Sequence, residues 1–125
     1  MAHAGVASPI GVLLMTFGSA ATPEDVPAYM ASVRGGPAPD DLVEEFQRRY
    51  RLIGGSPLVA ITRAQASALE TLLKDESSGS ERFVVRVGMR HSPPFIADGL
   101  RELTDLGIGR VLAIVLSPQY SPIIM

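Results

Sequence analysis

Residues 10–17 read IGVLLMTF, an almost unbroken apolar run that ends at Gly18-Ser19. Two later segments have the same character, FVVRV at residues 83–87 and VLAIVL at residues 111–116. Apolar and polar residues do not alternate in these runs, and strands that are covered on both faces of a parallel sheet are typically apolar in this way. We therefore expect three buried parallel strands.

Between these runs, apolar residues recur at the spacing of an α-helix. The start Thr22-Pro23 is typical of a helix, because the threonine oxygen can cap free N–H groups and proline has a helical φ. The first helix should bury Val26, Met30 and Val33, and the second should carry Leu42, Phe46 and Ile53 on one face. The patterns predict helices over residues 23–33, from Asp40 to Ile53, from Ser56-Pro57 to the polar loop 75–80, and from Ser92-Pro93 to Gly107.

Strands that alternate with helices predict an α/β fold, with a parallel sheet and helices on both of its faces. Ligands of such sheets bind beyond the carboxyl ends of the strands, here residues 17–19, 89–91 and 117–120. We expect residues 1–9 to be a disordered N-terminus. Residues 10–125 should form one α/β domain that is truncated at its C-terminal end, because its apolar last residues have no following element to pack against.

Composition restricts the class of partner. The net charge is −2 over 125 residues and the basic residues are mostly dispersed, so the sequence lacks the basic footprint of a nucleic-acid-binding protein. The absence of cysteine excludes disulfides, thiolate nucleophiles and cysteine-bound metals. We find neither a secretion signal nor an apolar run that could span a bilayer, and we expect a cytoplasmic protein.

A histidine and a basic helical segment are the first candidates for chemistry. His91 follows a predicted strand end, where an imidazole can bind a metal or transfer a proton; it can equally fix the turn by bonding a neighbouring carbonyl. Residues 48–51 read RRYR. A guanidinium beside the Tyr50 phenol can hold a ligand carboxylate, but part of this run must be a solvated helix face.

Two further positions also have two interpretations. Arg34 ends a predicted helix, where it can bind an anion or interact with the helix dipole. Ser56 follows two glycines and opens a helix whose free N–H groups can bind an anion, although a tight turn between helices explains the same residues. Neither a P-loop nor a GxGxxG motif follows the first strand. The motifs alone leave the function open.

Several phrases, in this order and spacing, resemble the amino-terminal half of ferrochelatases, including the bacterial enzymes that act on coproporphyrin. The phrases are GVLLMTFG at residues 11–18, RY at 49–50 with IGGSPL at 53–58, GMRH at 88–91 with PFI at 94–96, and LSPQYS at 116–121. The resemblance runs from Gly11 to Met125.

The resemblance implies a chelatase-like fold, in which two similar α/β domains enclose a porphyrin cleft and this chain supplies the first. It implies insertion of ferrous iron into coproporphyrin III or protoporphyrin IX in haem biosynthesis, a lyase reaction with iron and porphyrin as substrates and without an obligatory cofactor. The family's catalytic histidine and the acidic residue facing it belong to the second half. This chain would therefore need a C-terminal domain or a second copy of itself, and we expect no iron insertion by the chain alone.

The resemblance also implies which residues contact the porphyrin. Some family members have a tyrosine in place of Phe17 that gives iron an axial oxygen, whereas phenylalanine can only pack against the ring. His91 matches a histidine common in the family and stays a candidate catalytic residue; the metal ligands stay unknown. The implied porphyrin-binding residues are Phe17, Arg34, Arg49, Tyr50, Ser56 and Tyr120.

Two alternatives remain. One is a non-catalytic tetrapyrrole-binding module built on the same half-fold. The other is a short homodimeric chelatase that inserts cobalt or nickel into sirohydrochlorin; those proteins carry a histidine after the first strand, where this sequence has Phe17.

Overall fold

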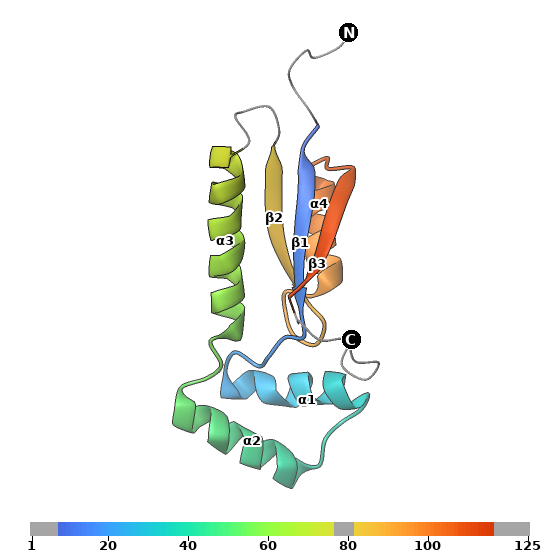
Figure 1. Ribbon diagram of the computed structural model, residues 1–125. Helices are drawn as coiled ribbons and strands as arrows, with labels where there is room; N and C mark the ends of the chain where they lie inside the picture. The colour runs from blue at the N-terminus through green and yellow to red at the C-terminus, as the bar shows by residue number, and fades with distance from the viewer. Residues whose placement is uncertain (1–7, 77–81, 117–125) are drawn as a thin grey trace.

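A parallel sheet organises the chain, whose computed structural model describes residues 8–76 and 82–116 (Figure 1). The strands are β1 (Ile10–Thr16), β2 (Phe83–Met89) and β3 (Arg110–Val115). Their order is β2-β1-β3, and β1 pairs in parallel with both neighbours. The predicted strands are thus confirmed, with shifts of one or two residues at their ends.

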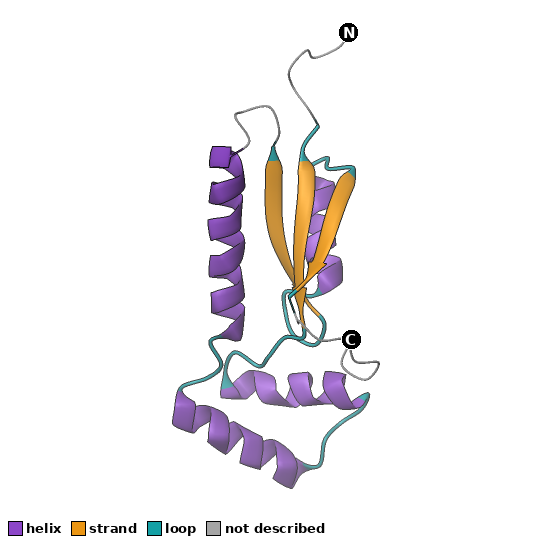
Figure 2. Cartoon of the chain, in the orientation of Figure 1, coloured by secondary structure: helices purple, strands orange, loops and turns teal. Residues whose placement is uncertain are grey.

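Helices cover both faces of the sheet, as predicted (Figure 2). Because successive side chains of a strand point to opposite faces, Val12 and Leu14 pack on one side with Ala66 of α3 (Leu58–Glu76). Leu13 packs on the other side with Leu103 of α4 (Ile96–Asp105). These two layers form the core of the α/β unit.

The third strand is less buried than its sequence suggests. The side chains of Leu112 and Ile114 are 56% and 43% exposed. They belong to the sheet-edge strand β3, whereas α3 and α4 pack mainly against β2 and β1. The expectation that all three strands are buried is therefore wrong for β3 within the described residues.

The outer edge of β2 is protected by charged side chains. Glu70 of α3 accepts a hydrogen bond from the Val85 N–H at 2.8 Å, and Arg86 donates to the Val85 carbonyl at 2.9 Å. Unpaired strand edges commonly carry such groups, which block pairing with another chain. The two edges of this sheet therefore differ, because β3 presents apolar side chains instead.

A helical hairpin lies beyond the carboxyl ends of the strands (Figure 1). It consists of the 3₁₀ turn Pro23–Asp25, α1 (Val26–Arg34) and α2 (Asp40–Ile53). The hairpin has a small core of its own around Ala20, Val26 and Met30. It thereby places a second layer of side chains next to the loops where ligands of α/β sheets bind.

One predicted helix start is confirmed and two differ. Thr22 is the N-cap residue and Pro23 the first residue of the first helical turn, and the Thr22 N–H and hydroxyl both donate to the Asp25 carboxylate, at 3.3 and 3.0 Å. Asp40 is already the first residue of α2, which follows Pro39. The fourth helix begins at Ile96 instead of Ser92-Pro93, because the preceding loop is held to the sheet by a 2.7 Å bond from the Met89 N–H to the Pro94 carbonyl.

Two residues that we expected in the core are exposed. Val33 is 44% and Ile53 70% exposed. Ile53 ends α2 directly before Gly54, and Val33 is the second-last residue of α1, two positions before Gly35; both glycines have positive φ and turn the chain away from the packed face. None of the helices in the described ranges is long and apolar enough to cross a membrane.

Candidate functional site

A cavity of about 470 Å³ lies at the carboxyl edge of the sheet. Its walls come from the loop after β1, from the hairpin and from the loop after β2. Small side chains, Ala20, Ala21 and Ala28, leave the space, and Pro93 and Phe95 add apolar surface. This volume is within the range of small-molecule sites, and the position is the ligand edge expected for the fold class.

Three rings form an aromatic wall beside the cavity. The Phe17 ring meets the His91 imidazole with centroids 4.6 Å apart and planes at 62°. It also meets the Tyr29 ring, with centroids 6.5 Å apart and planes at 83°. Such edge-to-face contacts are favourable, and a backbone bond from the His91 N–H to the Phe17 carbonyl at 3.0 Å fixes the two loops together.

The imidazole of His91 is held by a residue from the hairpin. Its Nδ1 lies 2.8 Å from the Ser32 Oγ of α1. Partial burial, followed by the positive charge of Arg90, lowers the pKa of His91 below its ordinary value. The ring is therefore neutral at neutral pH. The side chain bonds a hydroxyl, whereas the sequence suggested a neighbouring carbonyl.

Ser92 and Gly18 join the first two strand ends. The Ser92 Oγ is buried and accepts a hydrogen bond from the Ser19 N–H at 3.0 Å. Gly18 has φ +99°, and a Cβ at this position would lie 2.5 Å from the Ser92 Oγ. Glycine is therefore required here both by the backbone conformation and by the close approach of the two loops.

Replacing Ser92 by alanine should lower the free energy of unfolding by about 1–3 kcal/mol, because the buried Ser19 N–H loses its acceptor. Urea denaturation measures this change. The matched control is Ser32→Ala, which removes an exposed hydroxyl and should change stability by less than about 0.5 kcal/mol. Equal effects of the two substitutions would contradict the prediction.

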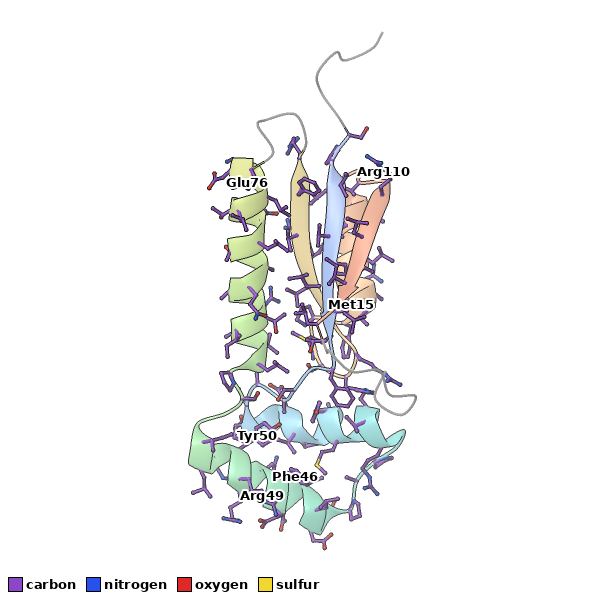
Figure 3. The ribbon with its side chains drawn as sticks, in the orientation of Figure 1. Met15, Phe46, Arg49, Tyr50, Glu76 and Arg110 are labelled. Atoms are coloured by element: carbon purple, nitrogen blue, oxygen red, sulfur yellow. The ribbon has the colours of Figure 1, made fainter. Side chains whose placement is uncertain are left out.

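Tyr50 and Ser56 both reach the loop after β1. The Tyr50 hydroxyl lies 3.3 Å from the Ser19 Oγ (Figure 3). The Ser56 N–H donates to the Ala21 carbonyl at 3.3 Å, and the Ser56 Oγ accepts the Leu58 N–H at the start of α3. The structure thus brings these two predicted residues and the pair Phe17–His91 to the same loop.

Phe17, Tyr50 and Ser56 do not line the cavity themselves but contact residues that do, whereas the predicted arginines lie on the helices of the hairpin. The Arg49 guanidinium is bound to the Glu45 carboxylate at 3.1 Å, on the surface of α2 (Figure 3). It also lies 5.3 Å from the Phe46 ring centroid. Arg34 is the last residue of α1. Neither arginine lines the cavity, and Tyr120 lies outside the described residues.

The carboxyl group of Glu45 should titrate far below its ordinary range. Hydrogen bonds from Arg48 and Arg49 lower its pKa from 4.5 to about 2. Because the folded-state pKa is depressed, these bonds contribute stability above pH 4.5, and this contribution is lost as the pH falls towards 2. An NMR titration of the Glu45 side chain measures this pKa, and a midpoint near 4.5 would contradict it.

Several residues of the site were not predicted. Tyr29 and Ser32 lie three positions apart on α1, a spacing that puts them on one face of the predicted helix. The sequence did not indicate that this face meets the loop after β2. Ser92 was interpreted only as a helix start. The described residues do not form a group of three or more His, Cys, Asp or Glu side chains that could hold a metal ion.

The fold and the site define a class of protein: a parallel α/β domain with an aromatic-walled cavity beyond the carboxyl ends of its strands. The model of the Ferrochelatase family matches residues 9–123, and the chain therefore belongs to the ferrochelatase family. The predicted family resemblance and the predicted fold class are both confirmed.

The curated relatives that the chain matches are considerably longer than it is. It is 41% identical over 115 residues to the ferrochelatase of Deinococcus radiodurans, which covers 90% of this chain and 35% of that protein. It is 38% identical over 114 residues to the coproporphyrin III ferrochelatases of a Geobacillus species and of Listeria monocytogenes, covering 90% of this chain and 36% and 37% of theirs. The chain spans about a third of the length of these relatives.

Proposed function

We propose that this chain forms the porphyrin-binding half of a ferrochelatase, the enzyme that inserts ferrous iron into coproporphyrin III or protoporphyrin IX in haem biosynthesis. The observation that carries the proposal is the cavity with its aromatic wall, placed at the ligand edge of a domain of this family. We assign the protein to the cytoplasm, with iron and porphyrin as substrates and without an obligatory cofactor.

The chemistry of the cavity suits a flat macrocycle. A porphyrin is largely apolar and planar, and it carries anionic propionates at its rim. The rings of Tyr29 and Phe95 line the cavity, the Phe17 ring contacts Tyr29 from beside it, and the alanines of the wall permit close approach. Tyr50 and Ser56 add polar atoms next to the same loop. We propose that these residues, with Tyr120, bind the ring.

Arginines are the natural partners of the propionates, because a guanidinium pairs with both oxygens of a carboxylate. Arg34 and Arg49 lie on the hairpin, outside the cavity wall. Arg49 now pairs with Glu45, so a propionate must share this guanidinium or replace the glutamate. Both partners are exposed, and an exposed ion pair contributes only about 0–1 kcal/mol, so the exchange costs little.

Within this proposal the chain binds and orients the porphyrin, and excludes water from one side of it. Removal of the pyrrole protons and entry of iron need the catalytic histidine and acidic residue that the family carries in its second half. We assign these groups to a C-terminal domain, because a second copy of the chain has the same sequence and cannot supply them. A tetrapyrrole-binding module without turnover is the second candidate, because the cavity and its aromatic wall suit ring binding without catalysis equally well.

The proposal is tested by titrating the purified chain with metal-free coproporphyrin III and protoporphyrin IX while following the porphyrin absorption band. We expect saturable binding and little or no insertion of ferrous iron. Absence of a spectral change with either porphyrin would overturn the proposal. Efficient iron insertion by the chain alone would overturn the assignment of catalysis to other groups.

Replacing Arg49 by alanine should weaken porphyrin binding about ten-fold, the effect of losing a charge-assisted bond of about 1.5 kcal/mol. Arg101→Ala is the matched control, because Arg101 is also exposed and paired with an acidic residue of its own helix, Asp98. Arg101 lies on α4, and its replacement should leave affinity unchanged. Equal porphyrin affinities of the unmodified chain and the two variants would mean that Arg49 does not bind the porphyrin and belongs only to the solvated face of α2.

A further inference from the structure

His91 has the features of an imidazole prepared to bind a metal. Metal-ligating histidines usually hold one ring nitrogen in a hydrogen bond, which fixes the ring and leaves the other nitrogen for the metal. The Nδ1 of His91 is so held, 2.8 Å from the Ser32 Oγ, between elements 59 residues apart in the sequence. Within the described residues, no hydrogen-bond partner is found for Nε2.

The orientation of the ring is also fixed by Phe17. The Phe17 ring packs edge-on against it at 4.6 Å, and the His91 N–H is bonded to the Phe17 carbonyl. When Nδ1–H donates to Ser32, the lone pair of the ring is on Nε2.

Other donor atoms on the cavity wall are less suited to this role. The Asp25 carboxylate accepts two bonds from Thr22, at 3.3 and 3.0 Å. The Ser92 Oγ accepts the Ser19 N–H. Burial, followed by Tyr50, raises the pKa of Tyr29, which keeps this phenol protonated. His91 is therefore the best available donor to a soft or borderline metal at this wall.

We propose that Nε2 of His91 is an axial ligand to the iron of a metallated porphyrin in the cavity, and that Ser32 is the residue that positions it. The porphyrin supplies four nitrogens, so a single protein ligand suffices and a cluster of metal-binding side chains is not needed. The step is the donation of a lone pair to iron, without oxidation or proton transfer. This inference rests on the proposed function, because it requires a porphyrin in the cavity.

The test compares ferric coproporphyrin III with metal-free coproporphyrin III on the purified chain. Absorption and electron paramagnetic resonance spectra report a nitrogen ligand to iron. We expect a histidine-ligated spectrum for the unmodified chain. His91→Ala should lose this spectrum and bind the iron complex about ten-fold more weakly, while its affinity for the metal-free porphyrin stays within about three-fold.

Added imidazole should restore the ligated spectrum in His91→Ala, because the small molecule fills the vacated position. His91→Asn is a second variant, which retains a polar side chain near Ser32 but has no imidazole nitrogen for iron. Ser32→Ala should leave a mixture of ligated and unligated spectra, and Ser32→Thr, which keeps the hydroxyl, should restore the ligated form.

The outcomes separate the two proposals. If metal-free porphyrin binds but the iron complex has no nitrogen ligand, or if both His91 variants keep the original spectrum, the ligand assignment is overturned and the proposed function stands. If Ser32→Ala matches the unmodified chain, the positioning role is overturned. If neither porphyrin binds, the proposed function fails, and the ligand assignment fails with it.

Discussion

Replacing Leu103 by alanine is expected to lower the free energy of unfolding by about 2–5 kcal/mol. The side chain is 0% exposed and lies between α4 and the sheet, in one cluster with Leu13 and Ile108. It fills the space left by Gly11, where a Cβ would lie 3.0 Å from one of its methyl groups. Urea denaturation followed by circular dichroism measures the loss.

A second leucine-to-alanine substitution separates the effect of burial from the effect of removing the same atoms. Leu106→Ala removes the same atoms three residues later, at the C-cap of α4, where the side chain is 55% exposed. We expect a change of about 1 kcal/mol or less, since little apolar surface is returned to water. The total stability of a domain of this size is about 5–15 kcal/mol, so Leu103→Ala removes a large fraction of it. Comparable losses in both variants would show that α4 does not pack as described.

The strands could be predicted because their signal is local. The apolar composition of residues 10–17 by itself indicates a buried strand. The alternation of strands with helices predicts the parallel pairing of β1 with β2 and β3. The exposure of Leu112 could not be predicted in the same way. An apolar composition indicates that a strand is covered in the complete fold. It does not indicate whether the strand lies at the edge of the sheet, because that position depends on contacts between residues far apart in the sequence.

The candidate site was predictable in part for the same reason. Phe17 and His91 follow strand ends, so the fold class alone placed them at one edge, and the structure has their rings 4.6 Å apart. Tyr29 and Ser32 were missed because the sequence does not specify which side of a helical hairpin meets a loop some 60 residues later. The prediction that the ligand is a porphyrin came from the family resemblance. The residue patterns predicted only the edge of the sheet at which a ligand binds.

The loop after β1 is the part of the site on which most contacts converge. Ser92 binds it from the loop after β2, Tyr50 binds it from α2, and Ser56 binds it from the start of α3. The shape of the cavity therefore depends on bonds from three separate elements to residues 19–21. A change that displaces one of these elements should affect both stability and ligand binding.

Gly55→Ala is expected to make such a change, with a loss of about 2–4 kcal/mol in the free energy of unfolding. Gly55 has φ +95°, which costs a residue with a side chain about 1–2 kcal/mol. In addition, a Cβ there would lie 2.3 Å from the Ala21 carbonyl oxygen, a backbone atom that cannot rotate away. The Ala21 carbonyl must move, and the hydrogen bond that it accepts from the Ser56 N–H must weaken or break.

Gly54 provides the control, because it has a similar φ of +78° but nothing lies within 4 Å of a Cβ built there. Gly54→Ala should lower the free energy of unfolding by only about 1 kcal/mol, the cost of a positive φ for alanine. It should bind coproporphyrin III as the unmodified chain does. Gly55→Ala should lose more stability and also bind the porphyrin more weakly, since Ala21 lines the cavity. Urea denaturation and the porphyrin titration measure the two effects. Equal behaviour of the two variants would mean that the contact between residue 55 and the loop after β1 does not shape the site.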